Sequence, residues 1–169
     1  MIFSKPQRVS NSNFISKFAI TNNLYLGSLA IFFVDRHYST NFDASWRVVN
    51  TEMDADFNSY RDYIQVNLSG KWVSEEAKNA LKASLEAARA ASVDKILLDM
   101  TQIELPDSDL VRIDSAESLV EILGTSIKVA VVKRKDDPSN LGYQFAQSRG
   151  ANIHVSTNPK KALDWLLSE

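Results

Sequence analysis

Three aspartates and a serine lie at the junction between an apolar segment and an expected helix. In the stretch LLDMTQIELPDSDL, residues 97–110, Asp99 follows an apolar run, and Asp107, Ser108 and Asp109 precede a helical pattern. Paired carboxylates can transfer protons or hold magnesium, although magnesium sites usually also need substrate phosphates. Ser and Asp at a helix start are also typical caps. We therefore predict a capped helix with loop hydrogen bonds, and we keep an enzyme that uses the three aspartates as an alternative.

Other catalytic and cofactor-binding motifs are missing from the sequence. It contains no G-x-G-x-x-G or G-x-x-x-x-G-K-[ST] pattern, and there are five glycines in the whole chain. The lack of cysteine excludes disulfides and thiolate metal sites, and it fits a reducing, cytoplasmic location. The two histidines, His37 and His154, are too few and too far apart in sequence to favour a triad or a zinc site. We predict a protein that is not an enzyme and needs no metal or cofactor.

The charge distribution argues against a nucleic-acid partner. The chain carries 19 basic and 21 acidic residues, for a net charge of −2, and no basic stripe interrupts the pattern. The basic run at residues 133–135 is followed at once by Asp136 and Asp137, which largely cancel its field. This favours a solvated loop over a site for phosphate.

Residues 1–45 differ in composition from the rest of the chain. They are rich in Ser, Asn, Phe and Ile, and no acidic residue precedes Asp35. The apolar run Leu24 to Val34 is well short of the roughly 20 residues that cross a bilayer, so we expect no stable membrane span. Three interpretations stay open for this segment: a poorly ordered or non-essential extension, a targeting segment, or a packing element.

Regular patterns begin at Trp46 and predict one α/β domain over residues 46–169. Two alternating segments are joined by the polar stretch EMDADFNSYRD, which predicts a hairpin with a long loop. Helices then alternate with short apolar strands, which implies a mostly parallel sheet. The predicted order is β-β-α-β-α-β-α-β-α, with strands at 46–51, 63–68, 95–100, 127–132 and 151–155, and helices beginning near Ser74, Asp107, Leu141 and Pro159.

Several quoted segments, in their order and spacing, resemble the STAS-domain superfamily. They are YIQVNLSGKW, KILLDMTQIE, IKVAVV, FAQSRGANIHV and NPKKALDWLL, and together they cover nearly all of the predicted domain. The resemblance is to the SpoIIAA-like (STAS/SEC14) group of small bacterial domains related to anti-sigma-factor antagonists. In those antagonists, the corresponding loop typically reads Asp-Ser-Ser-Gly, and a partner kinase phosphorylates a serine in it. Here the loop reads Pro-Asp-Ser-Asp-Leu, so the resemblance implies Ser108 as the switch residue but without the second Ser and the Gly.

Our leading hypothesis is a non-enzymatic STAS-like regulatory domain that acts through protein–protein contacts. The predicted contact surface is the loop and helix start at residues 101–113, with Ser108 as a phospho-switch beside Thr101, Asp107, Asp109 and Arg112. The resemblance implies a kinase or an anti-sigma-like regulator as partner. A homo-oligomer is a further option.

The second hypothesis is a carrier or sensor of a small apolar or acidic ligand held between sheet and helices. Trp72, Tyr143 and Phe145 would line such a site, and Lys133 or Arg134 would anchor an acidic head group. Two positions are possible for the Trp72 side chain: it covers the first helix as part of the core, or it belongs to an exposed contact surface.

Overall fold

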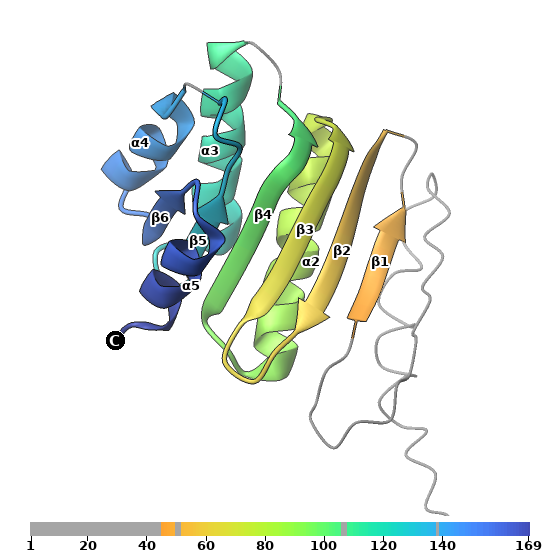
Figure 1. The fold of residues 1–169 in the computed structure, drawn as a ribbon, viewed down its shortest axis with the longest axis vertical. Coiled ribbons are helices and arrows are strands. Elements are labelled where there is room, and N and C mark those ends of the chain that lie inside the picture. Colours follow the sequence, from red (N-terminus) through yellow and green to blue (C-terminus); the bar gives the residue numbers. More distant parts are fainter. Residues whose placement is uncertain (1–44, 50–51, 106–107, 138) are drawn as a thin grey trace, which may run out of the picture.

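A computed structural model describes residues 45–49, 52–105, 108–137 and 139–169 of the chain, without the side chains of Val48 and Val49. The predictions made for residues 1–44 and for Asp107 lie outside the described residues. The polypeptide forms one open sheet with helices on both faces (Figure 1).

The sheet contains six strands in the order in which they occur in the chain. The first two pairings are antiparallel, and the three that follow are parallel. The predicted fold class, a small α/β domain whose antiparallel hairpin leads into parallel strands, is thereby confirmed. The strands are β1 (Ser45–Val49), β2 (Met53–Ser59), β3 (Ile64–Lys71), β4 (Lys95–Glu104), β5 (Lys128–Val132) and β6 (Ile153–Ser156).

One strand was not expected. The segment predicted as a polar loop between the first two strands contains β2, so that prediction was wrong. Met53, Ala55 and Phe57 are buried, and the polar residues between them point to the other face of the sheet. Of the described helices, only α5 (Pro159–Leu167) covers that face, and it lies over β4, β5 and β6. Helix α5 does not reach β2, so the residues of β2 on this face can be Asp and Asn. The sequence of β2 is therefore more polar than that of a strand covered on both faces.

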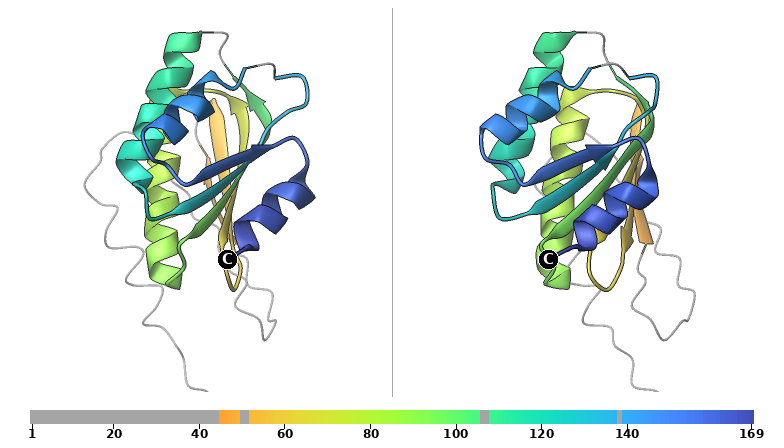
Figure 2. Two further views of the ribbon diagram at one scale, coloured as in Figure 1. Left: turned by 90° about the vertical axis from the view of Figure 1, so that its left-hand side faces the viewer. Right: turned by 60° about the vertical axis from the view of Figure 1, so that its left-hand side comes forward.

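The other helices lie on the opposite face of the sheet, as the side views show (Figure 2). They are α2 (Ser74–Ala91), α3 (Asp109–Leu123) and α4 (Leu141–Ser148). Each connects two neighbouring parallel strands and moves the chain one strand further in the same direction. Connections between parallel strands are almost always right-handed. Because each of these connections leads to the next strand in the same direction across the sheet, α2, α3 and α4 lie on the same face. No helix among the described residues is long and apolar enough to cross a membrane.

Two hydrophobic clusters result from this arrangement. The larger lies between the sheet and α2, α3 and α4, and the smaller lies under α5. Neighbouring residues of β4 divide between them: Leu98 belongs to the larger cluster and Leu97 to the smaller. This alternation explains why the parallel strands appear as continuous apolar runs, since both of their faces are covered.

The predicted helix starts were correct for α5 but not for α2. The side chain of Asn158 accepts a hydrogen bond from the backbone amide of Lys161, as a capping residue should. At α2 the cap position is Val73 rather than Ser74, and no side chain caps the helix. Instead, the carboxylate of Glu76 in the first turn accepts a hydrogen bond of 3.1 Å from the amide of Met53. The helix start is thereby tied to the beginning of β2.

Gly70 allows the end of β3 to approach the residue before β2. Its φ is +90°, and a Cβ atom there would lie 2.3 Å from the carbonyl oxygen of Glu52. We therefore expect Gly70→Ala to lower the free energy of unfolding by about 3 kcal/mol or more, because backbone strain and a backbone clash add together. The matched control is Gly124→Ala, where φ is +68° but the space is open, with an expected loss of about 1–2 kcal/mol. Urea denaturation measures both, and equal losses would contradict the steric argument.

Candidate functional site beneath and beside helix α3

Helix α3 packs mainly on α2 and α4 rather than on the strands. A cavity of about 80 Å³ lies in the layer between these helices and the sheet, and we call it the α3 cavity. Its floor is formed by β3, β4 and β6, and its walls by α2 and α4. The lining includes Val66, Leu68, Trp72, Ala80, Leu81, Ser84, Leu98, Met100, Leu105, Arg112, Ser115, Ala116, Leu119, Tyr143, Ala146 and Ile153.

The α3 cavity is lined almost entirely by apolar groups. The hydroxyls of Ser84 and Ser115 do not face it as free donors, because they bond to the carbonyls of Ala80 and Val111 in their own helices. The Tyr143 hydroxyl has only a weak contact of 4.0 Å with the sulfur of Met100. The indole Nε1 of Trp72 is buried and has no hydrogen-bond partner within the described protein. The α3 cavity is therefore apolar, and the unpaired indole nitrogen belongs to one of the residues that line it.

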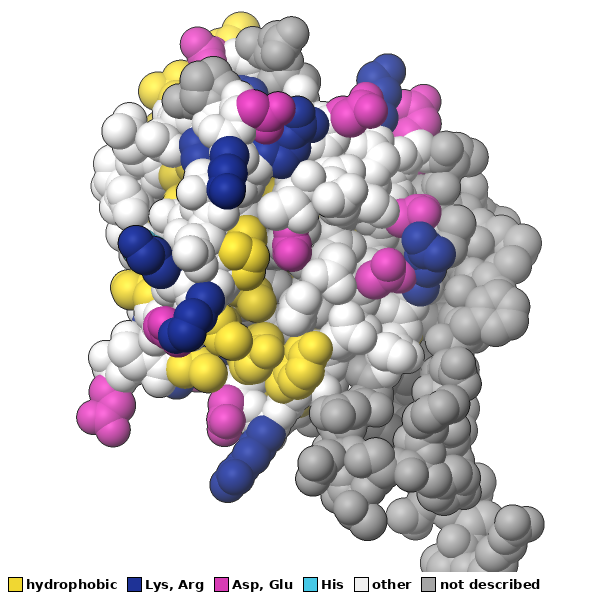
Figure 3. Space-filling model, in the orientation of Figure 1, with side chains coloured by type: hydrophobic (Ala, Val, Ile, Leu, Met, Phe, Trp, Pro, Cys, Tyr) yellow, Lys and Arg dark blue, Asp and Glu magenta, His cyan; other side chains and the backbone are white. Residues whose placement is uncertain are grey.

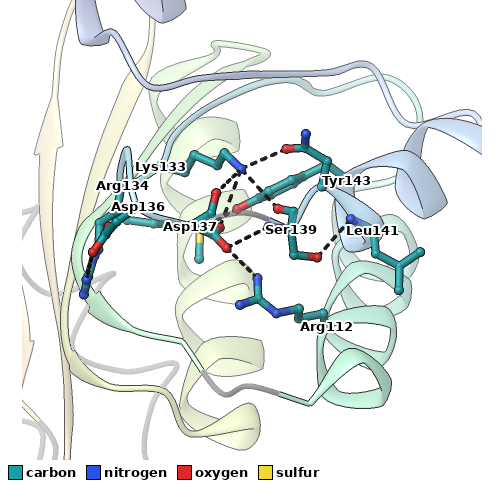
Figure 4. A network of polar contacts seen from close by, with 10 residues as sticks. Arg112, Lys133, Arg134, Asp136, Asp137, Ser139, Leu141 and Tyr143 are labelled. Atoms are coloured by element: carbon teal, nitrogen blue, oxygen red, sulfur yellow. Dashed lines mark hydrogen bonds and ion pairs between the residues drawn. The ribbon is translucent and has the colours of Figure 1, made fainter.

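A buried ion cluster closes one end of this region (Figure 4). Arg112 of α3 donates to Oδ1 of Asp137 at 3.0 Å, and Nζ of Lys133 lies 3.8 Å from Oδ2. These side chains are only 15%, 6% and 9% exposed for Arg112, Asp137 and Lys133, respectively. Oδ2 of Asp137 receives no hydrogen bond, so the positive charge of the Lys133 ammonium group offsets the cost of burying this oxygen.

Lys133 is also the hydrogen-bond centre of the loop that follows β5. Its ammonium group donates to the carbonyl oxygens of Asp137 and Ser139 and to the side-chain oxygen of Asn140, at 2.9, 3.1 and 2.9 Å. Three donors and three oxygens satisfy the ammonium group completely. The loop is thus wrapped around Lys133 and joined to α3 through Asp137.

The same surroundings change the acidity of Tyr143. Burial raises the pKa of its phenol to about 12, and the negative charge of Asp137 acts in the same direction, while Arg112 opposes it. The hydroxyl therefore stays protonated over the whole physiological pH range and keeps its capacity to donate.

The start of α3 is exposed on the outer side of the helix. Ser108 and Asp109 are exposed, and Leu110 in the first turn is 79% exposed. Ser108 occupies the cap position, but its side chain makes no capping hydrogen bond, which differs from the expected cap. Its hydroxyl is therefore not committed to the helix.

The structure separates the residues that were predicted to form one contact surface. Ser108 and Asp109 are together, but Arg112 is held by Asp137. The Thr101 hydroxyl donates to Asp99 at 2.7 Å, and Asp99 pairs with Val132 of the smaller cluster, so Thr101 lies on the opposite face of the sheet. Within the described residues, no group of three or more His, Asp or Glu side chains is placed to hold a metal ion.

The residues predicted to line a ligand site are also divided. Trp72 and Tyr143 line the α3 cavity, whereas Phe145 is not part of its lining and packs under Arg149 instead. Lys133 is committed to its own loop, and Arg134 is exposed and paired with Asp136.

Asp137 was missed in the sequence, since it appeared to be one charge of a solvated loop. Its partner Arg112 lies 25 positions earlier in the chain, so no local pattern joins them. A signal was present in Lys133, because a lysine that directly continues a buried strand needs an anion nearby.

The buried position of Asp137 predicts a large effect of neutralising it. In Asp137→Asn, Arg112 and Lys133 lose their anion, and we expect the free energy of unfolding to fall by about 3–5 kcal/mol. The control is Asp136→Asn, which breaks an exposed pair with Arg134 and should leave stability nearly unchanged. Urea denaturation of both variants tests this, and a small loss for Asp137→Asn would show that the cluster does not hold the loop.

The raised pKa of Tyr143 predicts a loss of stability at alkaline pH. Because the folded-state pKa of about 12 exceeds the ordinary tyrosine pKa of 10.0, the stability that the buried neutral phenol contributes is complete below pH 10 and is lost as the pH rises through 12. Wild type should therefore lose on the order of 2–3 kcal/mol more than Tyr143→Phe between pH 9 and 12. Unfolding by urea across this range measures the difference, and parallel curves for the two proteins would refute it.

Comparison with known proteins gives matches among solved structures. No family model matches the chain, and no curated protein matches it. An anti-sigma factor antagonist from Mycobacterium paratuberculosis superposes with a TM-score of 0.49 at 17% identity, over 71% of this chain and 98% of that one. The anti-sigma factor antagonist SpoIIAA in its unphosphorylated form gives a TM-score of 0.40 at 13% identity, over 66% and 94%. Both of these solved structures are anti-sigma factor antagonists, the class of proteins that the quoted sequence segments resemble.

Proposed function

We propose that the chain is a regulatory binding domain that docks a protein partner through the first turn of α3. The contact surface consists of Ser108, Asp109 and Leu110, which we call the α3 start. The observation that carries the proposal is the exposure of Leu110, which is 79% accessible although it belongs to a well-formed helix. Fully burying a leucine against a partner contributes about 1.5–3 kcal/mol.

A second apolar residue lies near the α3 start. Leu141 is 37% exposed in the first turn of α4. The two helices touch near this end, because a Cβ on Gly142 would lie 2.7 Å from the carbonyl oxygen of Arg112. Hydrophobic side chains reach the surface where these helices begin, at the upper end of the molecule in Figure 3. Single exposed leucines are common, but two on adjoining helix starts are more typical of a contact site.

The charges of the α3 start define the partner. Ser108 and Asp109 are exposed next to Leu110, and Arg112 is already neutralised by Asp137. A partner with an apolar pocket bordered by Lys or Arg would complement this surface. Phosphorylation of the uncommitted Ser108 hydroxyl would add nearly two negative charges to it and change the affinity. The resemblance to anti-sigma factor antagonists agrees with a kinase or an anti-sigma-like regulator in this role.

The test is binding by matched leucine variants. The immobilised full chain retrieves partners from an extract of its source organism, and affinity for each identified and purified partner is then measured by calorimetry. Leu110→Asp should weaken binding at least about tenfold, because an anchor residue of an interface is lost. Leu167→Asp, the same substitution at an exposed leucine of α5, should bind as wild type does. No loss in Leu110→Asp, or the same loss in both variants, would refute the α3 start as the docking site.

Replacement of Ser108 tests the switch separately. Ser108→Asp should change the partner's affinity severalfold, because it adds a charge at the contact, whereas Ser108→Ala should bind like the unmodified protein. Equal affinities for all three proteins, together with the lack of a modified Ser108 in mass spectra of the native protein, would remove the switch while leaving the docking site standing.

A further inference from the structure

The α3 cavity is not used by protein docking at the α3 start. It lies between the sheet and three helices, and its wall is almost entirely apolar. We propose that it binds a small, uncharged hydrocarbon that carries no hydrogen-bonding group. At about 80 Å³ the space is roughly half of the apolar cavity of about 150 Å³ that holds benzene, which limits the ligand to about three or four heavy atoms.

Small side chains on three helices leave this space open. Ala80 of α2, Ala116 of α3 and Ala146 of α4 are buried and line the cavity. The helices cannot move together to close it, because α3 and α4 already meet at Gly142. A Cβ atom on Gly142 would lie 2.7 Å from the carbonyl oxygen of Arg112. The apolar groups of the wall therefore lack van der Waals partners on one side, and a ligand of matching size supplies them.

The polar groups of the wall offer little to a ligand. The hydroxyls of Ser84 and Ser115 donate to carbonyl oxygens of their own helices. The indole nitrogen of Trp72 has less than 1 Å² of accessible surface, so a molecule in the cavity does not reach it. The Tyr143 hydroxyl donates weakly to the sulfur of Met100. A ligand with a polar group would lose its hydrogen bonds to water without gaining equivalent bonds in the cavity.

Ions and water are also poor occupants of this cavity. Among the described lining residues, Arg112 carries the only charge, and it already donates to Asp137 at 3.0 Å. A charged ligand would enter an apolar space whose one cation is paired, which is costly. A buried water normally makes two to four hydrogen bonds, and apolar cavities stay dry. The occupant that fits is therefore uncharged and apolar.

Three probes of one shape separate a hydrocarbon from polar and charged ligands. Acetone replaces the methylene group of 2-methylpropene by an oxygen, and acetate carries a negative charge on the same framework. Each is titrated into the full chain with ¹³C-labelled methyl groups and followed by NMR. 2-Methylpropene should shift the methyl resonances of Met100 and Leu119 saturably and leave those of Ala130 and Ala162, under α5, unchanged. Acetone should bind about tenfold or more weakly, because its carbonyl oxygen loses hydrogen bonds to water, and acetate should give no saturable shift.

Matched alanine variants locate the site. Ala116→Leu fills the space with a longer side chain and should abolish binding of 2-methylpropene. Ala80→Val is the milder second filling variant and should also weaken binding. The controls are Ala90→Leu and Ala90→Val, at an exposed position of α2 outside the lining, and both should bind as wild type does. Circular dichroism and cooperative unfolding show that each variant is folded.

Specific results would overturn the proposal. These are an affinity for acetone equal to that for 2-methylpropene, saturable binding of acetate, no saturable binding of 2-methylpropene, or wild-type affinity in both filling variants. The inference is independent of protein docking, because Leu110 does not line the cavity. Leu110→Asp should therefore leave binding of 2-methylpropene unchanged, and a loss of binding in this variant would contradict the assigned site.

Discussion

The buried carboxylate of Asp137 is the interaction on which this end of the domain depends. Burying an unpaired charge is very unfavourable, so Asp137 requires both Arg112 and Lys133. These residues come from α3, from the end of β5 and from the loop before α4. Because α3 has few contacts with the strands, this cluster is its main polar connection to the layer below. Satisfying this carboxylate joins the first turns of α3 to the loop before α4, while Ala116, Leu119 and Leu123 pack the rest of the helix into the larger cluster.

The alternation of elements could be predicted from the sequence because it depends on local patterns. Asn158 before Pro159 marked the start of α5 correctly, since capping involves atoms three residues apart. The prediction failed at β2, where Asp54 and Asp56 suggested a loop. These side chains are polar because no described helix covers their face of the sheet at β2. Whether a helix covers a strand depends on distant parts of the chain, so the sequence of the strand itself does not reveal it. Local chemistry therefore identified the cap of α5, but the capping hydrogen bonds expected at Ser74 and Ser108 are absent and the half-covered strand was missed.

The site was less predictable because it depends on pairings between distant residues. Lys133 was interpreted as a free anchor, but its three donors are used within its own loop. Thr101 and Ser108 are seven positions apart, yet β4 continues to Glu104 and places Thr101 on the other face of the sheet. The predicted strand ended at residue 100, which placed Thr101 in the loop with Ser108. In the structure Thr101 is still part of β4, so the two residues are far from each other. The cavity is the space that the side chains of several strands and helices leave unfilled, so the sequence of no single segment predicts it.

Helix α3 has different surroundings on its outer and inner sides. Its outer side at the first turn carries Leu110, and its inner side, through Ser115, Ala116 and Leu119, roofs the cavity. Leu110 therefore belongs to a helix whose other side is held by core packing and by the pair between Arg112 and Asp137. A protein partner would therefore meet this leucine on a helix that is already ordered, which lowers the entropy cost of docking.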